Sequence, residues 1–140
     1  MAANSRLTIA VHALTWIALA QRRGQEWLTS EQVAASVNTN AVIIRRSLGD
    51  LRRAGLVEVR HGAGAGWSMA RAPEEITLLQ VYDAVEREPL FAMHHTEPNL
   101  ECPIGRGIRP VLDVVYDRAD QSLRRELGLT SIADVLRDCL

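Results

Sequence analysis

The stretch from Asn38 to Gly55 constrains the fold of this chain most, because it combines an apolar face with an arginine face. Its apolar residues recur at spacings that keep one side of a helix buried. They are Val42, Ile43, Leu48, Leu51 and Leu56. Asn38 can accept hydrogen bonds from the free N–H groups at a helix start, and Gly55 can end the helix in a left-handed conformation. We therefore predict a helix between them.

A shorter helix is predicted directly before this one. Thr29 and Gln32 have the spacing of a capping box, and the apolar residues that follow point inward as far as about Ser36. A short helix, a tight turn over residues 38–40 and a helix with an uncharged polar start are typical of helix-turn-helix DNA readers. Taken alone, the same pattern fits a helical hairpin with a solvated charged face equally well.

The start of the second helix carries the side chains best placed to enter a major groove. Asparagine can pair with adenine through two hydrogen bonds, and arginine can bind guanine or phosphate. On this basis the predicted DNA-binding residues of the helix are Thr39, Asn40, Val42, Arg45, Arg46 and Arg53.

A β-hairpin is predicted next. Residues 56–60 and 67–70 alternate and are β-prone, and the glycine-rich run 61–66 joins them. Glycines there permit positive φ and let backbone N–H groups approach a phosphate. A hairpin directly after such a helix is the wing of a winged helix. Its predicted contacts with the DNA backbone or minor groove come from Arg60, His61 and Gly62.

The winged domain is completed by two further helices. An apolar stripe indicates a helix over residues 5–23, which Gly24 ends, and Thr77 caps a second helix that stops before Pro89. We expect this second helix to pack on the first one.

The C-terminal part combines a long loop with a long helix. Residues 88–106 show no clear period, and long loops in compact proteins are often functional. A helix is predicted from Ile108 to Leu127 with Pro110 in its first turn, followed by a short helix capped by Thr130. The long helix has more apolar face than the small domain can cover, so it needs a partner, most simply a second copy of the chain.

The predicted fold is mainly α with a small β-hairpin wing. It divides into a winged helix-turn-helix DNA-binding domain over residues 1–87, a sensor or effector loop over 88–106, and a dimerisation helix with a C-terminal helix over 107–140.

Charge is distributed unevenly along the chain. Residues 1–71 hold nine arginines and four acidic residues, whereas residues 72–140 hold seven arginines and thirteen acidic residues, and the chain has no lysine. A basic first half suits a module that binds phosphates, and the acidic second half should face away from DNA.

The cellular setting is predicted from what the sequence lacks. No apolar run reaches the roughly 18 residues of a membrane span, and the polar start lacks a cleavable signal. We therefore expect a cytoplasmic protein with no membrane partner, in which Cys102 and Cys139 are thiols.

Four blocks in this order resemble the Rrf2 family of winged helix-turn-helix transcriptional regulators, of the IscR, NsrR and CymR type. They are TSEQVAASVNTNAVIIRRSLGDLRRAGLVEVRHGAGAGW, ITLLQVYDAVE, NLECPIGRGIRPVLDVVYDRA and LTSIADVL. The resemblance covers essentially the whole chain. It implies a winged-helix homodimer that binds palindromic double-stranded DNA, with the recognition helix on residues 39–53, the wing on residues 60–66 and the long helix as the dimerisation element.

The resemblance also brings a departure from the family pattern. Members that sense through an iron–sulfur cluster place three cysteines between the fourth helix and the dimerisation helix, and this chain has only Cys102 there. Clusters need mostly thiolate ligands. We therefore expect no iron–sulfur cluster, and no metal site at His94 and His95. Cys102 remains open as an oxidant sensor or as a plain half-buried thiol, and a small-molecule effector in the loop is a further alternative.

The sequence thus favours a DNA-binding transcriptional regulator, with repression the expected mode. The alternative is a winged-helix interaction module that no longer binds DNA, which the overall charge of −1 keeps open. An enzyme is not expected, because the chain shows no Ser/His/Asp grouping, no paired carboxylates in a plausible cleft and no nucleotide-binding loop.

Overall fold

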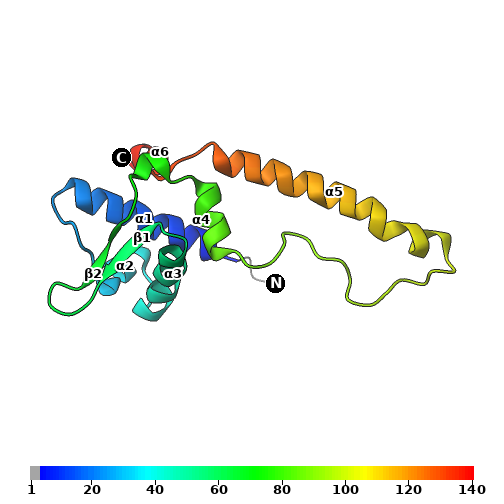
Figure 1. Ribbon diagram of the computed structural model, residues 1–140, viewed down its shortest axis with the longest axis horizontal. Helices are drawn as coiled ribbons and strands as arrows, with labels where there is room; N and C mark the ends of the chain where they lie inside the picture. The colour runs from blue at the N-terminus through cyan, green and yellow to red at the C-terminus, as the bar shows by residue number, and fades with distance from the viewer. Residues whose placement is uncertain (1–3) are drawn as a thin grey trace.

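The structure is a computed structural model that describes residues 4–140. Six α-helices, a short 3₁₀ helix and a two-stranded antiparallel sheet follow one another in the described residues (Figure 1). Their bounds are α1 Arg6–Arg22, α2 Ser30–Val37, α3 Ala41–Arg53, β1 Val57–Arg60, β2 Gly66–Met69, η1 Pro73–Glu75, α4 Leu78–Val85, α5 Pro103–Gly128 and α6 Ile132–Cys139. The predicted class, mainly α with a β-hairpin wing and a long C-terminal helix, is confirmed.

Helix α1 lies at the centre of the hydrophobic core. Its residues Leu14 and Ile17 are almost completely buried, and α2, α3, α4, β2 and α6 all contact the helix. The last helix returns to this core, because Ile132 and Leu136 of α6 are buried in the same cluster. The C-terminal end of the chain therefore closes the winged domain.

The turn between α2 and α3 differs from the prediction. Asn38 does not cap α3: it ends α2 in a left-handed conformation with φ 64°, and its N–H donates to the carbonyl of Ala34. Asn40 is the cap, and its Oδ1 accepts a hydrogen bond of 3.0 Å from the N–H of Ile43. Asparagine suits both positions, since it tolerates the left-handed region and also caps helices. The prediction at the other end of α3 is confirmed, because Gly55 adopts φ 78°.

The buried face of α3 also differs from the prediction. Ile44, Leu48 and Leu51 form it, and the residues Val42 and Ile43 remain 57% and 37% exposed. Two residues along a helix correspond to about 200° of rotation, so the core that holds Ile44 forces Val42 to the opposite side.

The wing is anchored to the start of α2. Strands β1 and β2 pair from Val57 opposite Met69 to Arg60 opposite Gly66. Leu28 then adds a third, one-residue strand by exchanging two backbone hydrogen bonds with Trp67, at 3.0 and 2.7 Å. A side chain at Gly66 would meet the Leu28 carbonyl oxygen at 2.9 Å, so the close approach requires glycine.

Helix α5 begins earlier than the sequence suggested. Pro103 occupies its first turn, so the loop runs only from residue 86 to residue 102, and Pro110 lies inside the helix. There it leaves the carbonyl of Arg106 without the usual N–H partner. The last helix is capped by Ser131, which forms a capping box with Asp134, and not by Thr130.

Helix α5 forms a long arm that projects from the winged domain; the 86–102 loop runs along it to the far end, and α5 then returns to the domain (Figure 1). Near the C-terminal end of α5, Arg124 donates two hydrogen bonds to the carboxylate of Asp83 in α4, at 2.8 and 3.0 Å. The loop is held by Arg109, which donates to the carbonyls of His94 and Thr96, both at 2.8 Å. No helix in the described residues is both long and apolar enough to cross a membrane.

Candidate nucleic-acid interface

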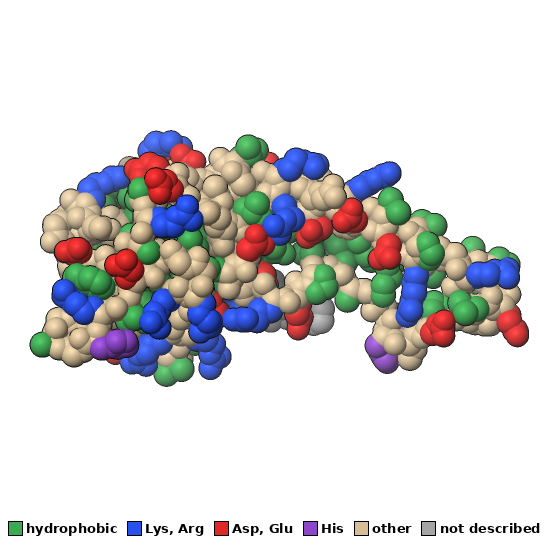
Figure 2. Space-filling view, in the orientation of Figure 1, with side chains coloured by type: hydrophobic (Ala, Val, Ile, Leu, Met, Phe, Trp, Pro, Cys, Tyr) green, Lys and Arg blue, Asp and Glu red, His purple; other side chains and the backbone are tan. Residues whose placement is uncertain are grey.

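The outer face of α3, which we define as Val42, Arg46, Gly49 and Arg53, lies opposite the residues that α3 buries. These positions follow one another at helical spacings of four, three and four residues. Val42, Arg46 and Arg53 are exposed. Figure 2 shows arginine side chains gathered along the edge of the winged domain where Figure 1 places α3. The outer face is therefore both exposed and basic.

The polar residues at the start of α3 are partly engaged in local structure. Thr39 is half-buried in the turn. The Oδ1 atom of Asn40 already accepts the capping hydrogen bond, so bidentate pairing with adenine would have to share or release it. The side-chain NH₂ of Asn40 has no hydrogen-bond partner among the described residues.

Arg45 and Arg46 are both exposed but differ in their partners. The Nη2 atom of Arg45 donates to Glu31 of α2 at 2.9 Å, and both side chains are more than half exposed. The pKa of the Glu31 carboxyl is lowered, first by a backbone hydrogen bond and then by Arg45. Arg46 forms no ion pair or side-chain hydrogen bond within residues 4–140. Its five N–H donors are therefore available to a ligand.

The wing holds its own arginine in a fixed position. Nε of Arg60 donates to the carbonyl of Gly64 at 2.9 Å, and the guanidinium lies 4.4 Å from the centre of the Trp27 ring. His61 and Gly62 at the tip are exposed, and Gly62 has φ 78°, as the prediction of a glycine-dependent turn requires. Behind the tip, Trp67 Nε1 donates to Ser30 Oγ at 3.0 Å and ties the wing to α2.

A buried carboxylate organises the other flank of α3, and sequence reasoning missed it. Asp50, whose side chain is only 10% exposed, pairs with Arg53 one turn later and with Arg87 after α4, the latter at 2.7 Å. Nearby, Arg6 at the start of α1 lies 3.5 Å from Glu86. The Asp50–Arg53 pair has a local helical spacing of three residues, whereas the contacts of Arg87 and Arg6 join segments far apart in the chain and have no sequence motif.

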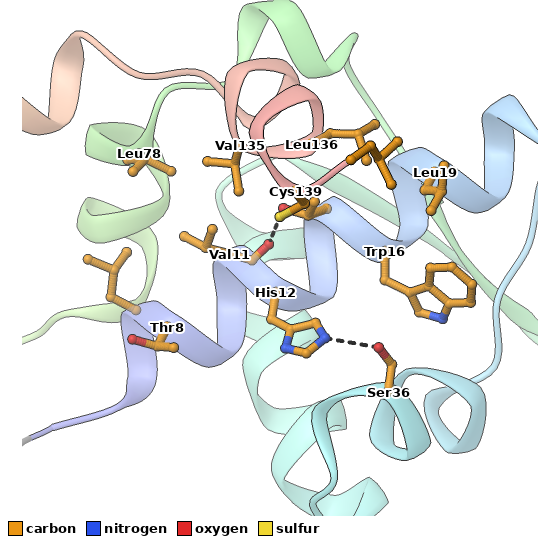
Figure 3. A pocket seen from close by; sticks show the side chains of 13 residues that line it. Thr8, Val11, His12, Trp16, Leu19, Ser36, Leu78, Val135, Leu136 and Cys139 are labelled. Carbon is orange, nitrogen blue, oxygen red and sulfur yellow. Dashed lines mark hydrogen bonds between the residues drawn. The ribbon is translucent and has the colours of Figure 1, made fainter.

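A hollow of the described residues lies along α1, away from α3. This α1 groove has a volume of about 500 Å³ and is mostly apolar, with α6 on one side of α1 and α2 on the other (Figure 3). Val11 and Trp16 of α1 and Leu136 of α6 line it. His12 faces Ser36 of α2, with 2.9 Å between Nε2 and Oγ.

The sensor candidate Cys102 is exposed, which corrects the expectation of a half-buried thiol. It is the residue directly before α5, and its N–H donates to the carbonyl of Asn99. Cys139 is also exposed, but it lines the α1 groove instead. The two thiols thus belong to different parts of the protomer.

Comparison with known proteins places these features in a family. The family model Rrf2, described as iron-dependent transcriptional regulator, matches residues 3–138. YwnA of Bacillus subtilis, whose name describes a helix-turn-helix transcriptional regulator, is 39% identical over 134 residues, which cover 95% of this chain and 96% of YwnA.

Solved structures share the fold. A crystal structure described as a DNA-binding protein is 34% identical, with a TM-score of 0.74 over 94% of this chain and 99% of the other. The IscR structure from T. potens superposes with a TM-score of 0.72 at 21% identity, over 100% of this chain and 89% of that one. The winged-helix fold and the sequence-based resemblance are confirmed.

The family description names iron, but the residues described here do not suit an iron–sulfur cluster. Such clusters take mostly thiolates. The loop and α5 together contain a single cysteine, Cys102, and the second cysteine, Cys139, lies in α6. Within residues 4–140, no three His, Cys, Asp or Glu side chains converge as metal ligands would.

Proposed function

We propose that this chain, which belongs to the Rrf2 family of transcriptional regulators, acts as a dimeric repressor that binds a palindromic operator through α3 and the wing. The observation that carries the proposal is the outer face of α3, which stands exposed and basic between α2 and the wing on one side and α1 and α4 on the other. Such a helix fits a major groove about 12 Å wide.

Base recognition is assigned to the N-terminal half of α3. The exposed side chain of Val42 suits contact with a thymine methyl group, and the unpaired guanidinium of Arg46 suits a guanine edge. Thr39 and Asn40 lie at the same end of the helix and offer hydroxyl and amide groups.

Backbone contacts are assigned to the arginines on both flanks of this face and to the wing. Arg45 and Arg53 reach solvent although each is paired with a carboxylate, and one guanidinium can serve a carboxylate and a phosphate together. In the wing, Arg60, His61 and Gly62 are the proposed contacts with the sugar-phosphate backbone or the minor groove.

A second copy of the chain is the proposed partner of α5. The helix has no buried residue, and one face carries a stripe of exposed aliphatic side chains at spacings of four, three and four, which we call the α5 stripe: Ile104, Ile108, Val111 and Val115. Two such stripes related by a two-fold axis would cover each other. The dimer would present two α3 helices to half-sites about one helical turn apart.

This proposal assigns a role to each part of the chain. Residues 1–87, together with α6, would form the DNA-binding domain, the 86–102 loop would carry the effector response, and α5 would supply dimerisation. For the effector we propose oxidation of Cys102, whose thiol is exposed next to the first turn of the dimerisation helix, or a small ligand held by the loop. A bulky or charged group added to this thiol would disturb the end of the α5 stripe.

The test is fluorescence anisotropy with labelled fragments from the DNA upstream of the protein's own gene, at low and moderate salt. We expect selective, salt-sensitive binding by a dimer, which Arg46→Ala weakens and Arg23→Ala, at the far end of α1, does not. A reporter placed behind the bound fragment should be less active when the protein is present. Absence of selective binding at low salt would instead favour a protein-interaction module.

The proposed oxidation of Cys102 is tested with the same assay after mild peroxide treatment. Loss of binding in the parent and in Cys139→Ser, but not in Cys102→Ser, is the expected result for a thiol sensor. Equal loss in the two variants would remove Cys102 from the proposal.

A further inference from the structure

We propose that a cleft beside α3 binds one phosphate of the DNA backbone, on the flank of the helix that faces away from the wing. This α1–α3–α4 cleft has a volume of about 210 Å³. It is bounded by Arg6 and Ile9 of α1, by Ile43, Arg46 and Asp50 of α3, and by Val85 of α4. The inference rests on the proposed DNA binding and adds a contact that involves Arg6 and Arg87, which the sequence did not suggest.

The position of the cleft follows from how a helix fits a major groove. A helix with its side chains is about 10–12 Å wide, so a groove of about 12 Å brings a phosphate backbone along each flank. On one flank, Arg45 of α3 shares a cleft with α2 and the wing residues Arg60 and His61. The α1–α3–α4 cleft is its counterpart on the other flank, where the second backbone would pass.

The charges of this flank are layered, with arginines outside and carboxylates inside. Arg6, Arg53 and Arg87 have side chains that are 55%, 67% and 64% exposed. The carboxylates that hold them, Glu86 and Asp50, are only 14% and 10% exposed. An approaching phosphate would therefore meet guanidinium groups first, and the carboxylates would orient these groups from behind.

The cleft also retains positive charge after its ion pairs are counted. Four arginines, Arg6, Arg46, Arg53 and Arg87, surround two carboxylates. Among the paired arginines, Arg6 is held most weakly. Its guanidinium lies 3.5 Å from Glu86, which is an ion-pair distance, and it makes no hydrogen bond to any described residue. Both carboxylate oxygens of Glu86 are taken by Asn4 Nδ2, at 2.9 and 2.8 Å.

The backbone of Arg6 is fixed, whereas its guanidinium is held only by the ion pair with Glu86. Its N–H donates to Asn4 Oδ1 at 2.8 Å, and α1 is anchored in the core. Little backbone ordering would therefore oppose phosphate binding, and the Arg6 guanidinium can donate two parallel hydrogen bonds to a phosphate.

The decisive experiment combines the substitution Arg6→Gln with the replacement of single phosphates in the operator duplex, and compares the effects of each change alone and together. Neutral methylphosphonates replace the phosphates of each strand one at a time, and binding is measured for the parent and for Arg6→Gln. We expect one position per half-site, on the strand away from the wing, at which the methylphosphonate weakens the parent but leaves Arg6→Gln unaffected.

The salt dependence of the DNA-binding constant gives an independent measure of the Arg6 contact. Each phosphate contact contributes a slope of about 0.9 to the plot of log K against log salt, which corresponds to about a three-fold change in affinity between about 50 and 200 mM. Arg6→Gln should lower the slope by about one, Arg6→Lys should retain it, and Arg23→Gln at the other end of α1 should leave it unchanged.

The experiments distinguish a failure of this inference from a failure of the proposed function. Selective binding by the parent with no methylphosphonate position coupled to Arg6 would overturn this inference and leave the proposed function intact. Absence of selective binding by the parent would overturn both. Competition by inorganic phosphate beyond that of chloride at equal ionic strength, lost in Arg6→Gln but with no methylphosphonate position coupled to Arg6, would indicate a site for free phosphate and would contradict a backbone contact.

Discussion

Replacing Val111 by serine should weaken the proposed dimer by a predictable amount. Val111 lies in the middle of the α5 stripe, and 61% of it is exposed in the protomer. Full burial of a valine side chain is worth about 1.5–2 kcal/mol, so about 1 kcal/mol of this remains to be gained when a partner covers it. A two-fold axis doubles the effect, and about 2 kcal/mol corresponds to about a 30-fold increase in the dimer dissociation constant.

Analytical ultracentrifugation over a range of protein concentrations measures this constant directly. Leu129→Ser is the matched control, because Leu129 is also apolar and 76% exposed but lies at the end of α5, outside the stripe. Equal thermal midpoints of the isolated protomers would show that both variants fold. The reasoning fails if Val111→Ser dimerises as tightly as the parent, or if the parent is monomeric at all accessible concentrations.

Three further predictions concern the wing, α3 and α6. Gly66→Ala brings a methyl group to 2.9 Å from the Leu28 carbonyl oxygen, so we expect a urea titration to show that the free energy of unfolding falls by about 1–3 kcal/mol. An unchanged urea midpoint would mean that the strands move apart at no cost. Arg46→Gln should reduce anisotropy-measured affinity for the operator far more than for a scrambled fragment, whereas equal losses would assign Arg46 to a phosphate. Hydrogen bonds from Ser131 lower the pKa of Asp134 below its ordinary 3.8, so its stabilising effect is present above that pH and is lost as the pH falls through the folded-state value. Asp134→Asn should flatten this part of a thermal-midpoint profile against pH, and a profile identical to the parent's would rule the effect out.

Local sequence patterns predicted the order of elements because each rests on neighbouring residues. The capping box at Thr29, the cap at Thr77 and the glycine-rich hairpin tip are all present where the sequence indicated. Predictions failed where two residues of the same type compete locally. Asn38 and Asn40 both suit a helix start, and Pro103 and Pro110 both suit a first turn, so only packing in the folded chain decides between them.

The candidate site was predictable only in its continuous part. The arginines of α3 and the wing follow from consecutive residues, but their partners come from elsewhere in the chain. Glu31 holds Arg45 across the helix-turn-helix, and Asp50 gathers Arg87 from beyond α4. Contacts between segments 14 or 37 residues apart leave no periodic signal in a single sequence.

The layered charges of the winged domain also explain how a chain with a net charge of −1 can present a DNA-binding surface. Asp50 removes charge from the sum, yet it lies beneath Arg53 and Arg87 and holds their guanidinium groups in place at the surface. A phosphate interacts with the nearest exposed charges more strongly than with those behind them, because Coulomb energy falls with distance and the outer groups are the ones it contacts. Removing such a carboxylate should therefore make the net charge less negative while loosening the arginines it positions. Net charge is consequently a poor guide to DNA binding in this fold, and the depth of each carboxylate relative to its arginine is a better one.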